Sequence, residues 1–159
     1  MLVDAFVEIP RGSQNKYEFD VKKGHFVLDR VLYGSVHYPG EYGFIPNTIA
    51  EDGDPLDILV LSNVPTFPGC MVKARVLGAL EMVDDKGRDV KILAALDNDP
   101  RYDELQTLKD VPHHILKEIE HFFQIYKQLE GKETAVDGWR DLDFALKVIE
   151  ESRNNFAAL

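Results

Sequence analysis

Hydrophobic and polar residues alternate in short runs over the first hundred residues of the chain and recur at helical spacing towards its end. The early runs are rich in β-branched and aromatic residues, and Gly, Pro, Asn and Asp residues separate them. They predict strands at Leu2–Ile9, Lys16–Val21, His25–Leu32, Asp57–Ser62, Met71–Val83 and Lys91–Ala95. Short strands at this regular spacing predict a small β-barrel.

The segment 82–91 has the pattern of a hairpin, because a polar stretch with Lys86-Gly87 separates two apolar runs. A helix is predicted to begin at Asp110 or Pro112 and to stop near Gly131. Its inward face is predicted to contain Ile115, Ile119, Phe122 and Tyr126, with Leu116 and Phe123 beside them. A second helix is predicted from about Asp141, with Leu142, Ala145, Leu146, Ile149 and Phe156 facing inward.

Length, charge and composition exclude several classes of protein. A length of 159 residues without repeats or linkers predicts a single domain, residues 1–159. The net charge of −10 argues against a nucleic-acid partner and against an anionic membrane, since both require a basic surface. No apolar run is long enough for a membrane helix, and the segment 1–6 lacks the basic start of a signal peptide. With a lone cysteine, Cys70, these features predict a cytoplasmic protein.

An acidic segment, residues 51–57, holds four carboxylates in seven positions without a basic residue. Gly53 permits a tight turn, Pro55 stiffens its exit, and Asp57 leads into an apolar strand, so carboxylates would gather where hard cations such as Mg²⁺ bind. An EF-hand does not fit, because Asn63 stands where its closing Glu belongs. A phosphoaspartate-forming site fits poorly, since there the acidic pair usually follows the strand. On this segment alone, a metal site and a solvent-exposed acidic turn are equally supported.

A second acidic group lies around the predicted hairpin turn. Asp84 and Asp89 flank this turn, and Lys91 falls on the same strand face as Asp89. A carboxylate beside a lysine can bind a metal together with a phosphate that the metal holds. A solvated turn with an incidental salt bridge is the competing explanation.

Further charged and phenolic residues could complete an anion site. Glu8, Lys16, Glu18 and Arg30 fall in predicted strands, with Lys16 and Glu18 on one face. Tyr38 and Tyr42 flank a Pro-Gly turn, and Tyr126-Lys127 ends the first predicted helix. Each has an ordinary structural explanation when taken singly. The sequence has no P-loop, no dinucleotide-binding glycine motif and no metal-spaced histidine pair.

Taken together, these segments resemble the family I soluble inorganic pyrophosphatases over nearly the whole chain. The family's three-aspartate signature reads Asp52-Gly-Asp54-Pro-Leu-Asp57 here. Matching segments in family order are residues 7–10, 16–18, 29–30, 38–43, 84–91 and 121–127. The resemblance implies an α+β fold that is mainly β, a five-stranded OB-like barrel flanked by two main C-terminal helices. It also implies a homohexamer, as in the compact prokaryotic members.

The resemblance implies a multi-Mg²⁺ hydrolysis of pyrophosphate to two orthophosphates by a metal-activated water, with Mn²⁺ or other divalent ions as substitutes. Asp54 would accept the proton of the attacking water. The metal set would be Asp52, Asp57, Asp84 and Asp89, with Glu8 and Glu18 acting mainly through water. The phosphate set would be Lys16, Arg30, Tyr42, Lys91, Tyr126 and Lys127, with Tyr38 adjacent.

Two other functions remain as alternatives. A Mg²⁺-dependent hydrolase of nucleotides or longer polyphosphates would need a base-stacking platform or a longer basic groove. A non-enzymatic OB-type nucleic-acid binder would need a basic strand face studded with aromatic residues, whereas this chain is acidic.

Overall fold

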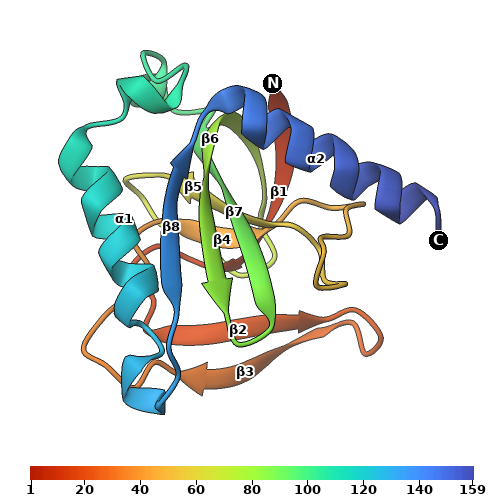
Figure 1. The fold of residues 1–159 in the computed structure, drawn as a ribbon, viewed down its shortest axis with the longest axis vertical. Helices are drawn as coiled ribbons and strands as arrows, with labels where there is room; N and C mark the ends of the chain where they lie inside the picture. The colour runs from red at the N-terminus through yellow and green to blue at the C-terminus, as the bar shows by residue number, and fades with distance from the viewer.

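Five strands close into a barrel in the computed structural model, which describes residues 1–159 (Figure 1). The barrel strands are β1 (Leu2–Ile9), β4 (Glu41–Phe44), β5 (Asp57–Leu61), β6 (Met71–Asp84) and β7 (Gly87–Leu96). They are hydrogen-bonded in the order β1-β4-β5-β7-β6, and pairing of β1 with β6 closes the ring. This confirms the predicted five-stranded barrel.

The pairing of β5 with β7 is the one parallel pair of the barrel; its other neighbouring strands are antiparallel. In this register Asp57 lies opposite Lys91, and Leu61 lies opposite Ala95. A slip by one residue would turn the buried apolar side chains of both strands to the wrong face, so the hydrophobic pattern fixes the register. The same register therefore sets a carboxylate beside an amine at the start of β5.

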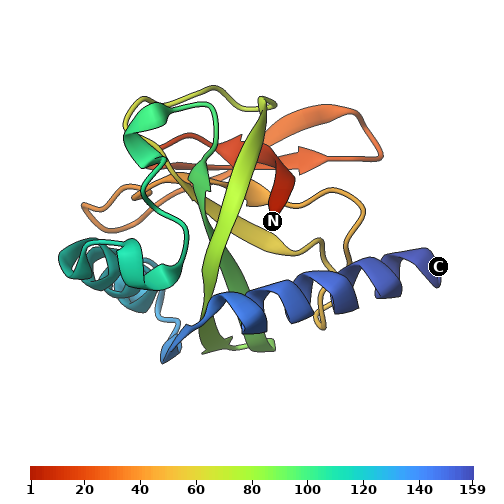
Figure 2. The same ribbon diagram turned by 90° about the horizontal axis from the view of Figure 1, so that it is seen from above.

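Two hydrophobic cores lie on opposite faces of the barrel strands, because successive side chains of a strand point to opposite faces. Ile58 and Val60 of β5 belong to the core that reaches helix α2 (Leu142–Ala157). Leu59 and Leu61 belong to the core that reaches helix α1 (His113–Ile125). The two helices thus each cover part of the barrel wall, as Figure 2 shows from above.

The remaining strands lie outside the ring. β2 (Asn15–Asp20) and β3 (His25–Val31) form a separate hairpin at the end of the molecule away from α2 (Figure 1). β8 (Ala135–Arg140) pairs with β6 on the side not used by β7. Short 3-10 turns complete the chain at Pro100–Tyr102, Leu108–Asp110 and Gln128–Glu130.

All six predicted strands and both predicted helices are present, and the hairpin between β6 and β7 turns at residues 85–86. The sequence did not predict β4 and β8. Helix α1 ends at Ile125, and Gly131 ends the following 3-10 turn instead. Two residues predicted to face inward lie at the surface, Ile115 with 37% and Phe156 with 41% of the residue's surface exposed, because each lies near a helix end. Neither helix combines the length and the apolar composition that crossing a bilayer requires.

Gly43 is the glycine whose replacement we expect to disturb the barrel most. A Cβ atom there would lie 1.8 Å from the carbonyl oxygen of Phe6 on the paired strand β1, so the strands would have to separate. We expect Gly43→Ala to lower the free energy of unfolding by about 3 kcal/mol, measured by urea denaturation. Gly34→Ala is the control, since a Cβ there meets only ordinary contacts at 3.8 Å. Equal stability of the two variants would contradict this reading of the β1–β4 contact.

Candidate active site

A cavity of 450 Å³ opens between the barrel, the β2–β3 hairpin and the end of α1. Twelve of the fourteen site residues predicted from the sequence line it: Glu8, Lys16, Glu18, Tyr42, Asp52, Asp54, Asp57, Asp84, Asp89, Lys91, Tyr126 and Lys127. They come from segments more than a hundred residues apart in the sequence. The fold therefore gathers the acidic and basic groups that the motifs singled out.

Lys91 lies at the centre of a compact polar cluster in the cavity wall. Its Nζ atom donates hydrogen bonds to Asp57 Oδ2 and Asp89 Oδ2, both at 3.0 Å, and to the Tyr42 hydroxyl at 2.7 Å. Tyr42 in turn donates to Asp57 Oδ2 at 2.8 Å. Burial would lower the pKa of Lys91, but the acidic neighbours, Asp57 foremost, outweigh it and hold that pKa well above its ordinary value. The amine is therefore a fixed positive charge, although only 3% of the side chain is exposed.

The aspartate loop, residues 51–57, is shaped by a tight turn. Gly53 has a φ of 87°, which a residue with a side chain rarely adopts, and its N–H donates to the Ala50 carbonyl at 3.0 Å. The Asp54 N–H donates to Asp52 Oδ1 at 3.0 Å. The Asp54 carboxylate itself makes no hydrogen bond or ion pair within the chain. It lines the cavity as a free acceptor.

Glu8, on β1, is a strongly perturbed acid. Burial, reinforced by the negative charge of Asp57, raises the pKa of Glu8 to about 7, even though the Phe19 N–H donates to its Oε2 atom at 2.9 Å. Near neutral pH this carboxylate is thus partly protonated unless more positive charge enters the cavity. The nearby Lys16 is already paired with Glu18 at 2.6 Å.

Tyr126 and Lys127 bring two donors from the end of α1. Burial raises the pKa of Tyr126 to about 12, so its hydroxyl keeps its proton and can donate. Burial lowers the pKa of Lys127, although Asp84 opposes that effect. The helix thus ends by presenting a hydroxyl and an amine to the cavity.

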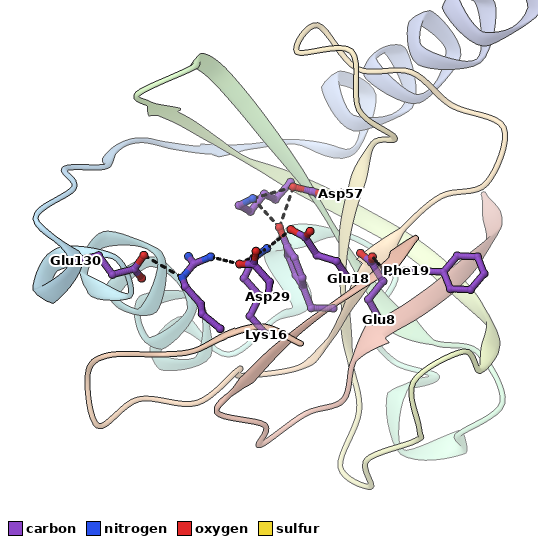
Figure 3. Close-up of polar contacts among 10 residues, drawn as sticks. Glu8, Lys16, Glu18, Phe19, Asp29, Asp57 and Glu130 are labelled. Atoms are coloured by element: carbon purple, nitrogen blue, oxygen red, sulfur yellow. Dashed lines mark hydrogen bonds and ion pairs between the residues drawn. The ribbon is translucent and has the colours of Figure 1, made fainter. Parts of the chain in front are cut away.

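Arg30 and Tyr38 are the two predicted site residues that do not line the cavity. Arg30 forms ion pairs with Asp29 and with Glu130, whose Oε1 lies 2.9 Å from Arg30 Nε. A row of alternating charges thus runs from Glu18 through Lys16 and Asp29 to the Arg30–Glu130 pair (Figure 3). Tyr38 is fully buried, its ring 5.3 Å from that of Tyr42 and 4.9 Å from that of Phe122. In this structure Tyr38 supports the ring of Tyr42 from behind.

The donor chemistry of the cavity fits hard divalent cations. Seven carboxylates and four lysines line it, an excess of three negative charges (7 − 4) when all are ionised. Asp57 and Asp89 each turn only Oδ2 towards Lys91, so a second oxygen remains on each. As the side chains lie, no three acidic, histidine or cysteine groups surround a common point, and Lys91 lies between Asp57 and Asp89 instead. Oxygen donors in excess of positive charge are what Mg²⁺ and similar ions require.

Four residues that contribute to or support this region were not predicted. Lys86 lines the cavity from the β6–β7 turn. Asp29 and Glu130 hold Arg30. Glu41 is a buried carboxylate just before Tyr42, and it accepts hydrogen bonds from the backbone N–H groups of Arg11 and Thr66. Asp29, Glu41 and Lys86 fall within the matched segments 29–30, 38–43 and 84–91, which is the only signal that the sequence held for them. Glu130 falls in no matched segment, and its pairing with Arg30 depends on the tertiary fold.

The comparisons with known proteins all match inorganic pyrophosphatases. The family model described as inorganic pyrophosphatase matches residues 5–157. A protein of Geobacillus stearothermophilus named inorganic pyrophosphatase is 54% identical over 150 residues, which cover 94% of this chain and 91% of that protein. One from Synechocystis with the same name is 52% identical over 155 residues, covering 98% and 92%. The crystal structure of inorganic pyrophosphatase from Thermus thermophilus superposes with a TM-score of 0.96 at 48% identity, covering 98% of this chain and 91% of that one.

Proposed function

The chain belongs to the inorganic pyrophosphatase family, and from this premise we propose that the cavity lined by the aspartate loop and Lys91 is its active site. The protein is an inorganic diphosphatase, a hydrolase that converts pyrophosphate to two orthophosphates. The observation that carries the assignment of the site is the convergence of twelve motif residues from distant segments on one cavity. Residues 1–159 would act as one catalytic domain.

Family membership implies a divalent metal cofactor, and Mg²⁺ is the ion we propose, several per site, with Mn²⁺ as a substitute. Asp52, Asp57, Asp84 and Asp89 would hold the ions directly, and Glu8 and Glu18 through water. Bound divalent cations lower the pKa of a water molecule and neutralise phosphate oxygens. The bound cations would also neutralise the excess negative charge of the cavity carboxylates.

The residues of the chain would then act at two places, on the attacking water and on the departing phosphate. Asp54, whose carboxylate is free of other partners, would take the proton of the attacking water while a new P–O bond forms at one phosphorus. As the bridging P–O bond breaks, Lys91, Lys16 and Lys127 would offset the charge that develops on the departing phosphate, and Tyr126 would donate a hydrogen bond to it. Arg30 and Tyr38, which lie outside the cavity, would act from its border, Tyr38 by supporting Tyr42.

We further propose that the protein works in the cytoplasm as a homohexamer. The hexamer rests on the resemblance to the compact prokaryotic members of the family. The cytoplasmic location rests on the lone cysteine, Cys70, which cannot form a disulfide within the chain.

The function is tested by phosphate release from three substrates at equal concentration. With Mg²⁺ we expect pyrophosphate to be hydrolysed at least about a hundredfold faster than ATP or tripolyphosphate, because the chain belongs to the inorganic pyrophosphatase family. A chelator should abolish the activity and added Mg²⁺ should restore it. Equal rates on ATP would favour the general polyphosphate hydrolase, and no hydrolysis of any substrate would favour a binding protein.

A further inference from the structure

The aspartate loop and the β6–β7 hairpin both contribute carboxylates to the cavity lining, and one ion pair joins the two segments. Glu51 directly precedes Asp52 in the aspartate loop, and Arg88 directly precedes Asp89 on β7. The Arg88 Nη1 atom lies 2.7 Å from Glu51 Oε1. The pair thus connects the neighbours of two proposed metal ligands that are 37 residues apart in the sequence.

The tip of the aspartate loop has no other polar link to the rest of the molecule. The chain just before the loop is fixed by two hydrogen bonds. The Ile49 N–H donates to the Ser152 carbonyl of α2 at 2.9 Å, and Asn155 Nδ2 donates to the Ile49 carbonyl at 3.2 Å. The remaining hydrogen bonds of residues 51–54 stay within residues 50–54. Only the Glu51–Arg88 pair ties the tip to another element.

Arg88 is itself held in place by Glu81 and Phe144. Its Nη2 atom lies 3.3 Å from Glu81 Oε2, and Glu81 is only 14% exposed. Arg140 of β8 approaches the other oxygen of Glu81 at 3.4 Å. The guanidinium also lies 5.7 Å from the centre of the Phe144 ring. A side chain with this support can act as a fixed anchor for the exposed carboxylate of Glu51.

We propose that Arg88, through Glu51, is a positioning residue that holds the aspartate loop against the β6–β7 hairpin, so that Asp52 and Asp89 remain close enough to share metal ions. The proposal rests on the proposed function. It has a physical cause in the repulsion between the two acidic turns, which would otherwise drive them apart before any cation arrives. Arg88 contacts neither substrate nor metal in this role.

The decisive variant is Arg88→Gln, because a general charge effect and a positioning effect would change the Mg²⁺ affinity in opposite directions. Removing a positive charge near an acidic cavity should tighten cation binding if only the electrostatic field matters. Loss of the anchor should weaken it. Since Arg88 is 38% and Glu51 64% exposed, the effect is that of a surface ion pair, about a three- to fivefold weaker Mg²⁺ affinity.

Mg²⁺ affinity is measured by isothermal titration calorimetry of the protein without substrate, and amide hydrogen exchange of residues 50–54 is measured without metal. Arg88→Gln should weaken binding, speed exchange at residues 50–54, and leave kcat at saturating Mg²⁺ within about twofold of the original. Adding Glu51→Gln to it should cause little further loss, because both changes break the same link. Asp4→Asn and Lys73→Gln are the control, since this exposed pair at 2.7 Å lies outside the cavity.

Two failures can be told apart. If the unaltered protein neither binds Mg²⁺ nor hydrolyses pyrophosphate, the proposed function is wrong, whereas the exchange measurement on the metal-free protein still decides whether Arg88 anchors the loop. If the unaltered protein does both, but Arg88→Gln binds Mg²⁺ equally or more tightly and exchanges at the same rate, the positioning role is overturned and the function stands.

Discussion

Replacing Asp54 by asparagine is expected to lower kcat for pyrophosphate by about a hundredfold or more, the contribution of a well-placed general base. The amide of asparagine matches the carboxylate in size but cannot accept the proton of water. Because the Asp54 carboxylate makes no hydrogen bond or ion pair within the chain, the fold should not depend on it. Initial rates at saturating Mg²⁺ and pyrophosphate measure the effect.

Asp85→Asn is the matched control for this experiment, because Asp85 is an exposed aspartate of the β6–β7 turn that does not line the cavity. It should retain nearly full activity. The Asp54→Asn protein should also keep its Tm and bind Mg²⁺ within a few-fold of the original affinity. Near-normal turnover of Asp54→Asn would show that another group accepts the proton.

Asp57→Asn is expected to weaken metal affinity and activity together. Asp57 accepts hydrogen bonds from Lys91 and Tyr42, and it is also a proposed direct metal ligand. Changes to groups that merely orient a ligand cost roughly 10- to 100-fold in metal affinity, so loss of the ligand should cost at least about tenfold. The Mg²⁺ concentration for half-maximal rate, compared with calorimetric Mg²⁺ affinity, measures the effect.

The same change should also destabilise the fold, in contrast to Asp54→Asn. Lys91 would keep Asp89 and Tyr42 as acceptors, and the amide oxygen of asparagine can also accept, but the negative charge beside this buried amine would be gone. Weakening a hydrogen bond to a buried charge in this way costs about 2 kcal/mol. Urea unfolding of the two variants side by side gives the comparison. An Asp57→Asn protein with unchanged stability and unchanged Mg²⁺ requirement would remove Asp57 from the metal set and from the buried cluster.

The sequence predicted the strands that carry strong β-branched or aromatic runs, such as β1 and β5, and the helix faces around Ile119 and Ile149. It missed β4 because Tyr42-Gly43, between two prolines, has the composition of a turn. Pairing of Gly43 with β1 makes it a strand, and no local pattern contains that information. Likewise β8 contains Gly138 and little alternation, and it exists because β6 offers a free edge.

The candidate site was predictable as a set of residues and less so as an arrangement. That Asp89 and Lys91 share a face follows from strand geometry, and their 3.0 Å contact agrees with it. The contact of Lys91 with Asp57 needs the parallel register of β5 and β7, which local patterns do not contain. Tyr38 could not be separated from Tyr42 by sequence, because the direction of a side chain near a turn depends on the fold around it.

Closure of the ring by β1 and β6 has a consequence for biosynthesis. Glu8 leaves the ribosome well before its partners, because its strand pairs with residues 71–75 and Glu8 itself shares a cavity with Lys127. A nascent chain therefore cannot form the complete cavity until Lys127 has been translated. A prematurely terminated product that ends before Tyr126 would therefore lack part of the proposed site.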